Sequence, residues 1–138
     1  MRHPTRPGRT PADSERGVAS VIAMTILFPL LFLFVLLAVQ ATVAYRTNQV
    51  AAHAAQEGAR LARTRNGSDA LGRAEAWKIL GALGPGTVLD PKVDVLRNGD
   101  TVRVEVRGRA YSVVPWLHPP VRQVSEGKVE RFRGPGSQ

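Results

Sequence analysis

The sequence contains no cysteine, which excludes both a disulfide framework and a thiolate metal site. Aromatic residues make up only 6% of the chain. The histidines are His3, His53 and His118, and none lies near another histidine or an acidic pair at metal-ligand spacing. We therefore interpret all three as solvated or structural residues, and we expect no metal and no cofactor.

Motifs that carry catalysis are also missing from the sequence. Neither common form of glycine-rich phosphate loop occurs, and there is no Gly-x-Ser-x-Gly nucleophile elbow. The carboxylates are few and scattered along the chain. We expect a protein that is not an enzyme and that has no small-molecule substrate.

Negative charge is scarce, and the formal net charge is +8. A balance this basic invites a nucleic-acid interpretation. The cations are spread along the chain, however, and the densest group, Arg103, Arg107 and Arg109, is interrupted by Glu105. We do not expect nucleic-acid binding, and we interpret the basic surface as one that faces anionic wall or membrane material.

Charge is absent altogether from Gly17 to Tyr45, and residues 18–39 form a continuous apolar run. A helix needs about 20 such residues to cross a bilayer core. We predict a transmembrane helix over residues 18–42. A rival interpretation is a secretory signal peptide, because the small-residue pattern at Val39-Gln40-Ala41 would allow cleavage after Ala41 and release of a secreted factor.

The flanks of this run predict its orientation. The short tail before it carries four arginines, Arg2, Arg6, Arg9 and Arg16. Positive charge beside a membrane span stays in the cytoplasm, whereas long domains cross largely regardless of their charge. We expect a basic cytoplasmic leader at 1–17 and an extracytoplasmic domain at 43–138, in a single-pass cell-membrane protein.

Pro29 lies inside the predicted span. Because proline has no N–H, the carbonyl of Thr25 loses its helical partner. We expect a kink or a loosened turn at this point, and a hydrogen bond from the Thr25 side chain to the backbone would ease the break.

The helical pattern continues beyond the span as an amphipathic helix that reaches Arg63. Its inner face is almost entirely small: Val43, Val50, Ala51, Ala54, Ala55, Gly58, Leu61 and Ala62. A face this small allows another element to pack very close to the helix axis. A second helix is predicted over about 69–82, with Ser68 as its N-cap and with Leu71, Ala74, Trp77, Ile79 and Leu80 available for packing.

The remaining residues predict strands. Residues 88–97 and 102–107 flank Asn98-Gly99, a strong hairpin-turn signal, and Val102, Val104 and Val106 alternate with charged residues. Prolines reduce 111–116 to an edge or a loop, and a last strand is expected from Val121 to Phe132, interrupted near 125–127. The predicted fold class is α+β: one long helix, one short helix and a small antiparallel sheet whose valine face either the small-residue face of the first helix or the second helix would cover.

Several of these features together resemble the TadE-like proteins, the minor pseudopilins of the tight-adherence (Flp) pilus system. The resemblance covers about residues 14–64 and is carried by Glu15-Arg16-Gly17, the apolar span with Pro29, Gln49-Val50-Ala51, and Ala54 through Arg60. The ending Val129-Glu130-Arg131-Phe132 is similar to that of some members.

The resemblance implies a pilin-type signal that is cleaved between Gly17 and Val18, with the helix kept as membrane anchor. It also implies as partners a prepilin peptidase, the Tad assembly platform with its ATPase, and pilin-like subunits. Many members carry a glutamate at the fifth position after the cleavage glycine, where this chain has Ile22. An unpaired carboxylate in hydrocarbon is costly and is kept only where a partner exists. Ile22 therefore indicates a subunit outside the filament, one at its tip, or an uncleaved accessory protein.

The function expected from the sequence is a structural one, that of a minor pseudopilin or a pilus-assembly accessory with a signal anchor. The alternatives are an anchored extracytoplasmic binding module that is not built into a filament, and the factor secreted after cleavage at Ala41.

Overall fold

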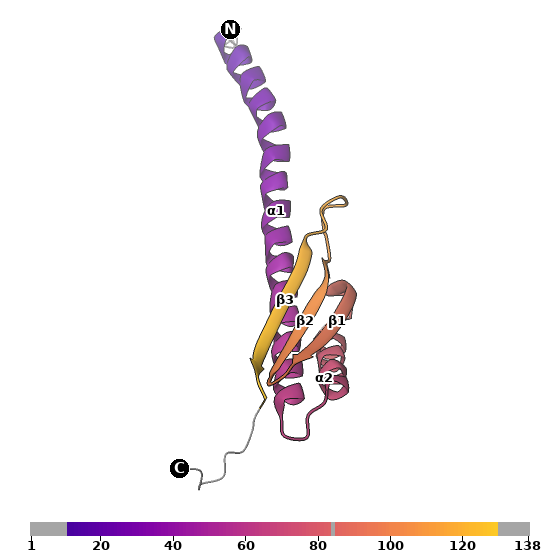
Figure 1. The fold of residues 1–138 in the computed structure, drawn as a ribbon. Coiled ribbons are helices and arrows are strands. Elements are labelled where there is room, and N and C mark those ends of the chain that lie inside the picture. The colour runs from indigo at the N-terminus through magenta and orange to yellow at the C-terminus, as the bar shows by residue number, and fades with distance from the viewer. Residues whose placement is uncertain (1–10, 84, 130–138) are drawn as a thin grey trace, which may run out of the picture. The chain divides into compact units, whose positions relative to one another are not determined.

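The computed structural model describes residues 11–83 and 85–129, with side chains from residue 17 onward. The elements follow the order α1 (Pro11–Arg63), α2 (Asp69–Ala82), β1 (Val88–Asn98), β2 (Thr101–Ala110) and β3 (Pro120–Lys128) (Figure 1). The predicted α+β class is confirmed. The chain divides into two compact units, Met1–Ala38 and Val39–Gln138.

Unit 1 contains the apolar part of α1. The helix continues through Pro29, so the proline does not interrupt it. The Thr25 hydroxyl donates a hydrogen bond to the carbonyl oxygen of Val21, 2.8 Å away and one turn earlier. The expected side-chain bond to the backbone is therefore present beside the proline.

Unit 2 is built on the remainder of α1, and its small-residue face is buried as predicted. Of the predicted residues, Ala51, Ala54, Ala55 and Ala62 are each at most 1% exposed, and Gly58 is also buried. Ala59, which the prediction did not include, is fully buried as well. Val43, Val50 and Leu61 are only half-buried. These alanines join the sheet valines in one core, so α1 covers one face of the sheet.

Helix α2 begins at the predicted cap, because the Ser68 hydroxyl accepts a hydrogen bond from the Leu71 amide. Its packing face agrees with the prediction only in part: Leu80 is buried and Ile79 packs against the core, as predicted. Gly72, Ala76 and Leu80 are buried, whereas Leu71, Ala74 and Trp77 are exposed. The large side chains are turned outward because α2 meets α1 through its smallest residues.

The contact between α1 and α2 brings the two backbones together at glycines. A Cβ atom added to Gly72 would lie 2.7 Å from the Gly58 carbonyl oxygen and 2.7 Å from the Ala62 Cβ. A Cβ added to Gly58 would lie 2.8 Å from the Gly72 carbonyl oxygen. The element that packs close to the small-residue face of α1 is thus α2.

The sheet is antiparallel in the order β1-β2-β3. The hairpin predicted at Asn98-Gly99 is present, but its loop lies one residue further on. Asn98 pairs with Thr101, which leaves Gly99 and Asp100 as the two loop residues. Gly99 has a φ of +56°, and a primed hairpin turn requires this conformation at its first central position.

The last strand also differs from the prediction. β3 continues unbroken across Ser125, Glu126 and Gly127, because each of them pairs with β2. The strand ends at Lys128, and the expected continuation to Phe132 lies outside the described residues. The segment from Tyr111 to Trp116 is a loop, as its prolines indicated.

A bulge interrupts the β1–β2 ladder between Leu89 and Lys92. It contains Pro91, which has no N–H to give to a ladder. It also contains Asp90, whose φ is +48° and whose carboxylate pairs with Arg109. The opposite residue on β2 is Gly108, where a Cβ would lie 2.4 Å from a methyl group of Val88. The bulge therefore depends on a glycine across from it.

Candidate functional site

The residues of the predicted cleavage site lie on α1. Gly17 is exposed, and a Cβ added there would meet nothing within 4 Å. Val18 is 60% exposed, and Ile22, one helical turn later on the same face, is 56% exposed. The structure thus places Gly17, Val18 and Ile22 on an open stretch of helix.

The apolar run that follows is bare around its whole circumference. The exposed large side chains of the run are 43–71% exposed. They include Val18, Val21, Met24, Phe28, Leu31, Phe34 and Val39. Among the residues described in unit 1, Leu36 is the single half-buried one. A helix that is apolar all round is a membrane span or needs an apolar environment. This one is long and apolar enough to cross a bilayer, which suggests single-pass anchoring.

Directly after this run, the structure shows a buried polar residue that the sequence analysis missed. The Gln40 side chain is 3% exposed. Its Oε1 accepts hydrogen bonds from the Val113 amide at 2.8 Å and from the Ser112 hydroxyl at 3.2 Å. Its Nε2 donates to the Tyr111 carbonyl oxygen at 3.4 Å. Gln40 therefore ties the loop after β2 to α1.

Two further polar residues of α1 attach it to other parts of unit 2. The Thr47 hydroxyl is fully buried and lies 2.8 Å from the Val43 carbonyl oxygen and 3.2 Å from that of Thr87. The Asn48 Oδ1 accepts a hydrogen bond from the Gln123 side chain of β3 at 3.0 Å. The buried side chains of Gln40 and Thr47 therefore both have hydrogen-bond partners, as burial requires.

The sequence did hold a signal for Gln40 and Thr47. They precede Ala51 by eleven and four residues, which are helical spacings that place all three on one stripe. The buried face of α1 therefore begins at Gln40, further toward the N-terminus than the small residues indicated.

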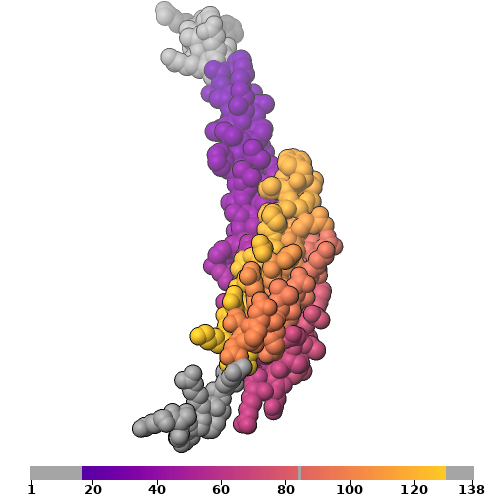
Figure 2. Space-filling model, in the orientation of Figure 1, coloured from indigo at the N-terminus to yellow at the C-terminus, as the bar shows by residue number. Residues whose placement is uncertain are grey.

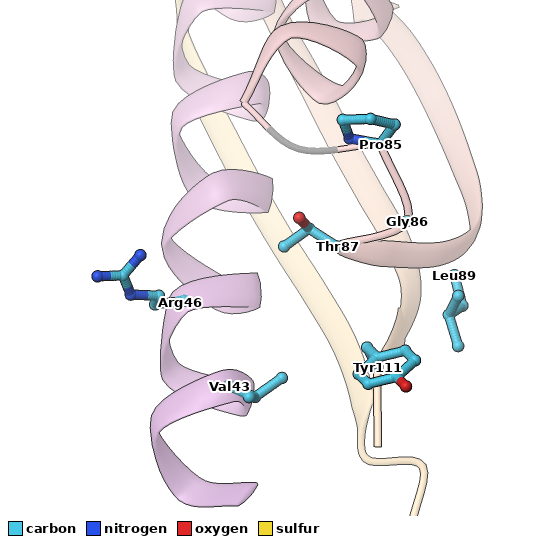
Figure 3. Close-up of a pocket in the computed structure, with 7 residues that line it drawn as sticks. All are labelled: Val43, Arg46, Pro85, Gly86, Thr87, Leu89 and Tyr111. Atoms are coloured by element: carbon cyan, nitrogen blue, oxygen red, sulfur yellow. The ribbon is translucent and has the colours of Figure 1, made fainter. Parts of the chain in front are cut away.

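Unit 2 also has a surface pocket of about 540 Å³. Its lining is Val43, Arg46, Pro85, Gly86, Thr87, Leu89 and Tyr111. In the close-up, Val43 points from α1 toward Tyr111, whereas the Arg46 guanidinium points away from the other lining residues (Figure 3). The pocket is therefore mainly apolar, and its lining includes no carboxylate, thiol or imidazole for catalysis.

The outer face of the sheet carries an ion cluster. Glu105 belongs to the charged face of β2, but its side chain is only 4% exposed. Arg107 Nε donates to Glu105 Oε1 at 2.6 Å, and Arg122 on β3 pairs with the same oxygen. Hydrogen bonds from Arg107 and then Arg122 lower the Glu105 pKa to about 2. Both guanidinium groups bind one oxygen of the carboxylate, which reduces its exposure to water.

The histidines, which the sequence analysis considered as possible metal ligands, form no site among the described residues. His53 and His118 are exposed, and His3 lies outside the described residues. In the described part of the chain, no group of three or more His, Cys, Asp or Glu side chains could hold a metal ion.

The sequence was compared with models of known protein families. The family model described as TadE-like protein matches residues 17–60. Searches of curated proteins and of solved structures gave no match. TadE-like components of pili are structural rather than enzymatic. Over residues 17–60 the chain is thus similar to TadE-like proteins, which confirms the resemblance drawn from its sequence. This similarity suggests a component associated with a Tad pilus.

Proposed function

We propose that the protein is a minor pseudopilin or assembly accessory of a Tad pilus. Residues 18–42 hold it in the membrane, the leader at 1–17 lies in the cytoplasm and residues 43–138 lie outside it. One observation carries this proposal. Within the segment that matches the family, α1 begins with an exposed apolar stretch and continues with a small-residue face that packs on the sheet. Such an arrangement provides an anchor and a domain presented at the membrane.

The rival interpretation, release after cleavage at Ala41, fits the packing of unit 2 poorly. Cleavage there would remove Gln40, which holds the Tyr111 carbonyl and the Val113 amide. Each hydrogen bond of this kind contributes on the order of 1 kcal/mol. Retention of the helix keeps these bonds, so the structure favours the anchored form.

The mass of the mature N-terminus separates the candidates. A protein that begins at Val18 supports pilin-type processing, an intact leader supports a plain anchored accessory, and a start at Thr42 supports the secreted factor. Gly17→Leu should keep the leader on, because the peptidase needs close approach to the backbone before the bond. Gly81→Leu, at a glycine whose Cβ position is equally open, is the matched control. Normal leader removal in Gly17→Leu would refute the pilin-type signal.

Position 22 tests the place of the subunit in the assembly. Ile22→Glu should bring no gain in pilus number if the protein caps the filament or stays outside it, because no partner amine awaits the carboxylate. A rise in pilus number or in subunit incorporation would point instead to an internal subunit. Pilus counts by microscopy and immunoblots of sheared pili give the readout.

Topology is tested separately from processing. A reporter that is active only after export should be active when fused after Gln138. The protein should also stay with the membrane in alkaline carbonate. Recovery of full-length protein in the soluble fraction would contradict the anchor, and a reporter active only in the cytoplasm would contradict the orientation.

A further inference from the structure

The loop between β2 and β3, residues 111–119, exposes large apolar side chains. Trp116 is 83% exposed, Tyr111 is 55% exposed, and Val113 and Leu117 are 40% exposed each. No Asp, Glu, Lys or Arg occurs from Ala110 to Val121. In the space-filling view the loop forms one tip of unit 2 (Figure 2). It is the second-longest uncharged stretch of the chain, after Gly17–Tyr45.

The backbone of the loop is fixed, so the exposure of these side chains is built in. The Ala110 amide donates to the Pro119 carbonyl oxygen at 2.9 Å and closes the base of the loop. The Leu117 amide donates to the Val114 carbonyl oxygen at 3.0 Å, and Val114 itself is buried. These bonds hold the loop in a conformation that keeps Trp116 exposed, so its ring is available to an apolar environment outside the domain.

The hydrogen bonds that attach the loop to Gln40 indicate which apolar environment Trp116 would meet. Gln40 binds the backbone of Tyr111 and Val113, and Gln40 directly follows Val39, the last residue of the apolar run. If the run spans the bilayer, Gln40 lies at the level where hydrocarbon gives way to headgroups. Tryptophan and tyrosine concentrate at that level because they combine an apolar ring with a polar N–H or O–H.

We infer that residues 111–117 insert their exposed side chains into the lipid headgroup interface, so that the domain rests on the membrane at a second point beside its helix. Arg109 and Arg122 flank the uncharged stretch, but both are engaged in ion pairs, with Asp90 and Glu105, so the inference rests on the apolar side chains of the loop. This inference rests on the proposed anchor. It adds that the domain is held against the bilayer by its β2–β3 loop.

The two tryptophans of the chain allow a direct test. Trp77→Phe leaves Trp116 as the only tryptophan, and Trp116→Phe leaves Trp77. Trp77 is beside Ala76, which packs near Gly58. Gly58 is eighteen residues beyond Gln40, or roughly 27 Å along the helix. Trp77 should therefore lie far from the bilayer and serves as the internal control. Both full-length variants are reconstituted in phosphatidylcholine vesicles whose acyl chains carry bromine either near the headgroup or near the chain end.

Trp116 fluorescence should be blue-shifted in vesicles and strongly quenched by bromine, more by bromine near the headgroup than by bromine near the chain end. Trp77 fluorescence should be quenched little by either lipid. A Trp116 that is unquenched, or quenched no more than Trp77, overturns the inference, and a blue shift without quenching assigns the loop to a protein contact instead. Flotation of the same vesicles on a density gradient monitors the anchor independently, because a protein that fails to float contradicts the proposed function itself.

Discussion

The close contact between α1 and α2 predicts opposite effects for one substitution at two positions of the same helix. Gly72 and Gly81 both lie in α2 (Asp69–Ala82). Alanine is favoured over glycine in a helix by about 1 kcal/mol. A Cβ at Gly81 would meet nothing within 4 Å. Gly81→Ala should therefore raise the free energy of unfolding by about 0.4–1 kcal/mol.

Gly72→Ala should lower it. The new methyl group would lie 2.7 Å from both the Ala62 Cβ and the Gly58 carbonyl oxygen, about 0.7 Å inside the 3.4 Å at which ordinary contact begins. One of these neighbours is backbone, so α1 and α2 must separate to admit the methyl. Overpacking of this kind costs about 1–3 kcal/mol. Because the helix-propensity gain is common to both variants, their difference should be about 1–3 kcal/mol.

The assay is guanidinium unfolding of the full chain in non-ionic micelles, followed by the fluorescence of Trp77 in a Trp116→Phe background. A compensating change sharpens the test. Ala62→Gly removes one of the two close contacts of the Gly72→Ala methyl and should restore part of the lost stability beyond the additive sum. Equal stabilities of Gly72→Ala and Gly81→Ala would refute the close approach of the two helices.

The remaining predictions concern the sheet and the loop. Val104→Thr places a hydroxyl in the core, where Val104 is 0% exposed, and should cost about 1–3 kcal/mol of unfolding free energy, whereas Val124→Thr, at a residue 42% exposed, should change it little. Because the pKa of Glu105 is lowered from 4.5 to about 2, its ion pairs stabilise the fold above pH 4.5 and are lost as the pH falls toward 2. The stability difference between the wild type and Glu105→Gln should shrink over that interval, and a constant difference would contradict the pairing. Gln40→Leu should speed hydrogen exchange at the Val113 amide but not at Val104, and unchanged exchange at Val113 would show that Gln40 does not hold the loop.

Several elements followed from the sequence because they depend on local chemistry. The apolar run could be predicted from its length and its lack of charge alone. The N-cap of α2 could be predicted from a serine that precedes a helical pattern. The alternation of Val102, Val104 and Val106 fixes which face of β2 is buried, because successive side chains of a strand point to opposite faces. The predicted cleavage and assembly positions, Gly17, Val18 and Ile22, came from resemblance and stay predictions.

Other features were decided only by the tertiary structure, because they depend on what lies across a contact. The choice of Gly72 over Leu71 and Trp77 for the face of α2 follows from the approach of α1, which admits no larger side chain. The burial of Glu105 required Arg122, a residue seventeen positions away that β-sheet pairing brings alongside. Gln40 is at the end of an apolar run in the sequence, but its role depends on backbone groups more than seventy residues later. Sequence periodicity shows which face of an element is apolar, whereas only the fold shows which distant groups meet that face and how closely.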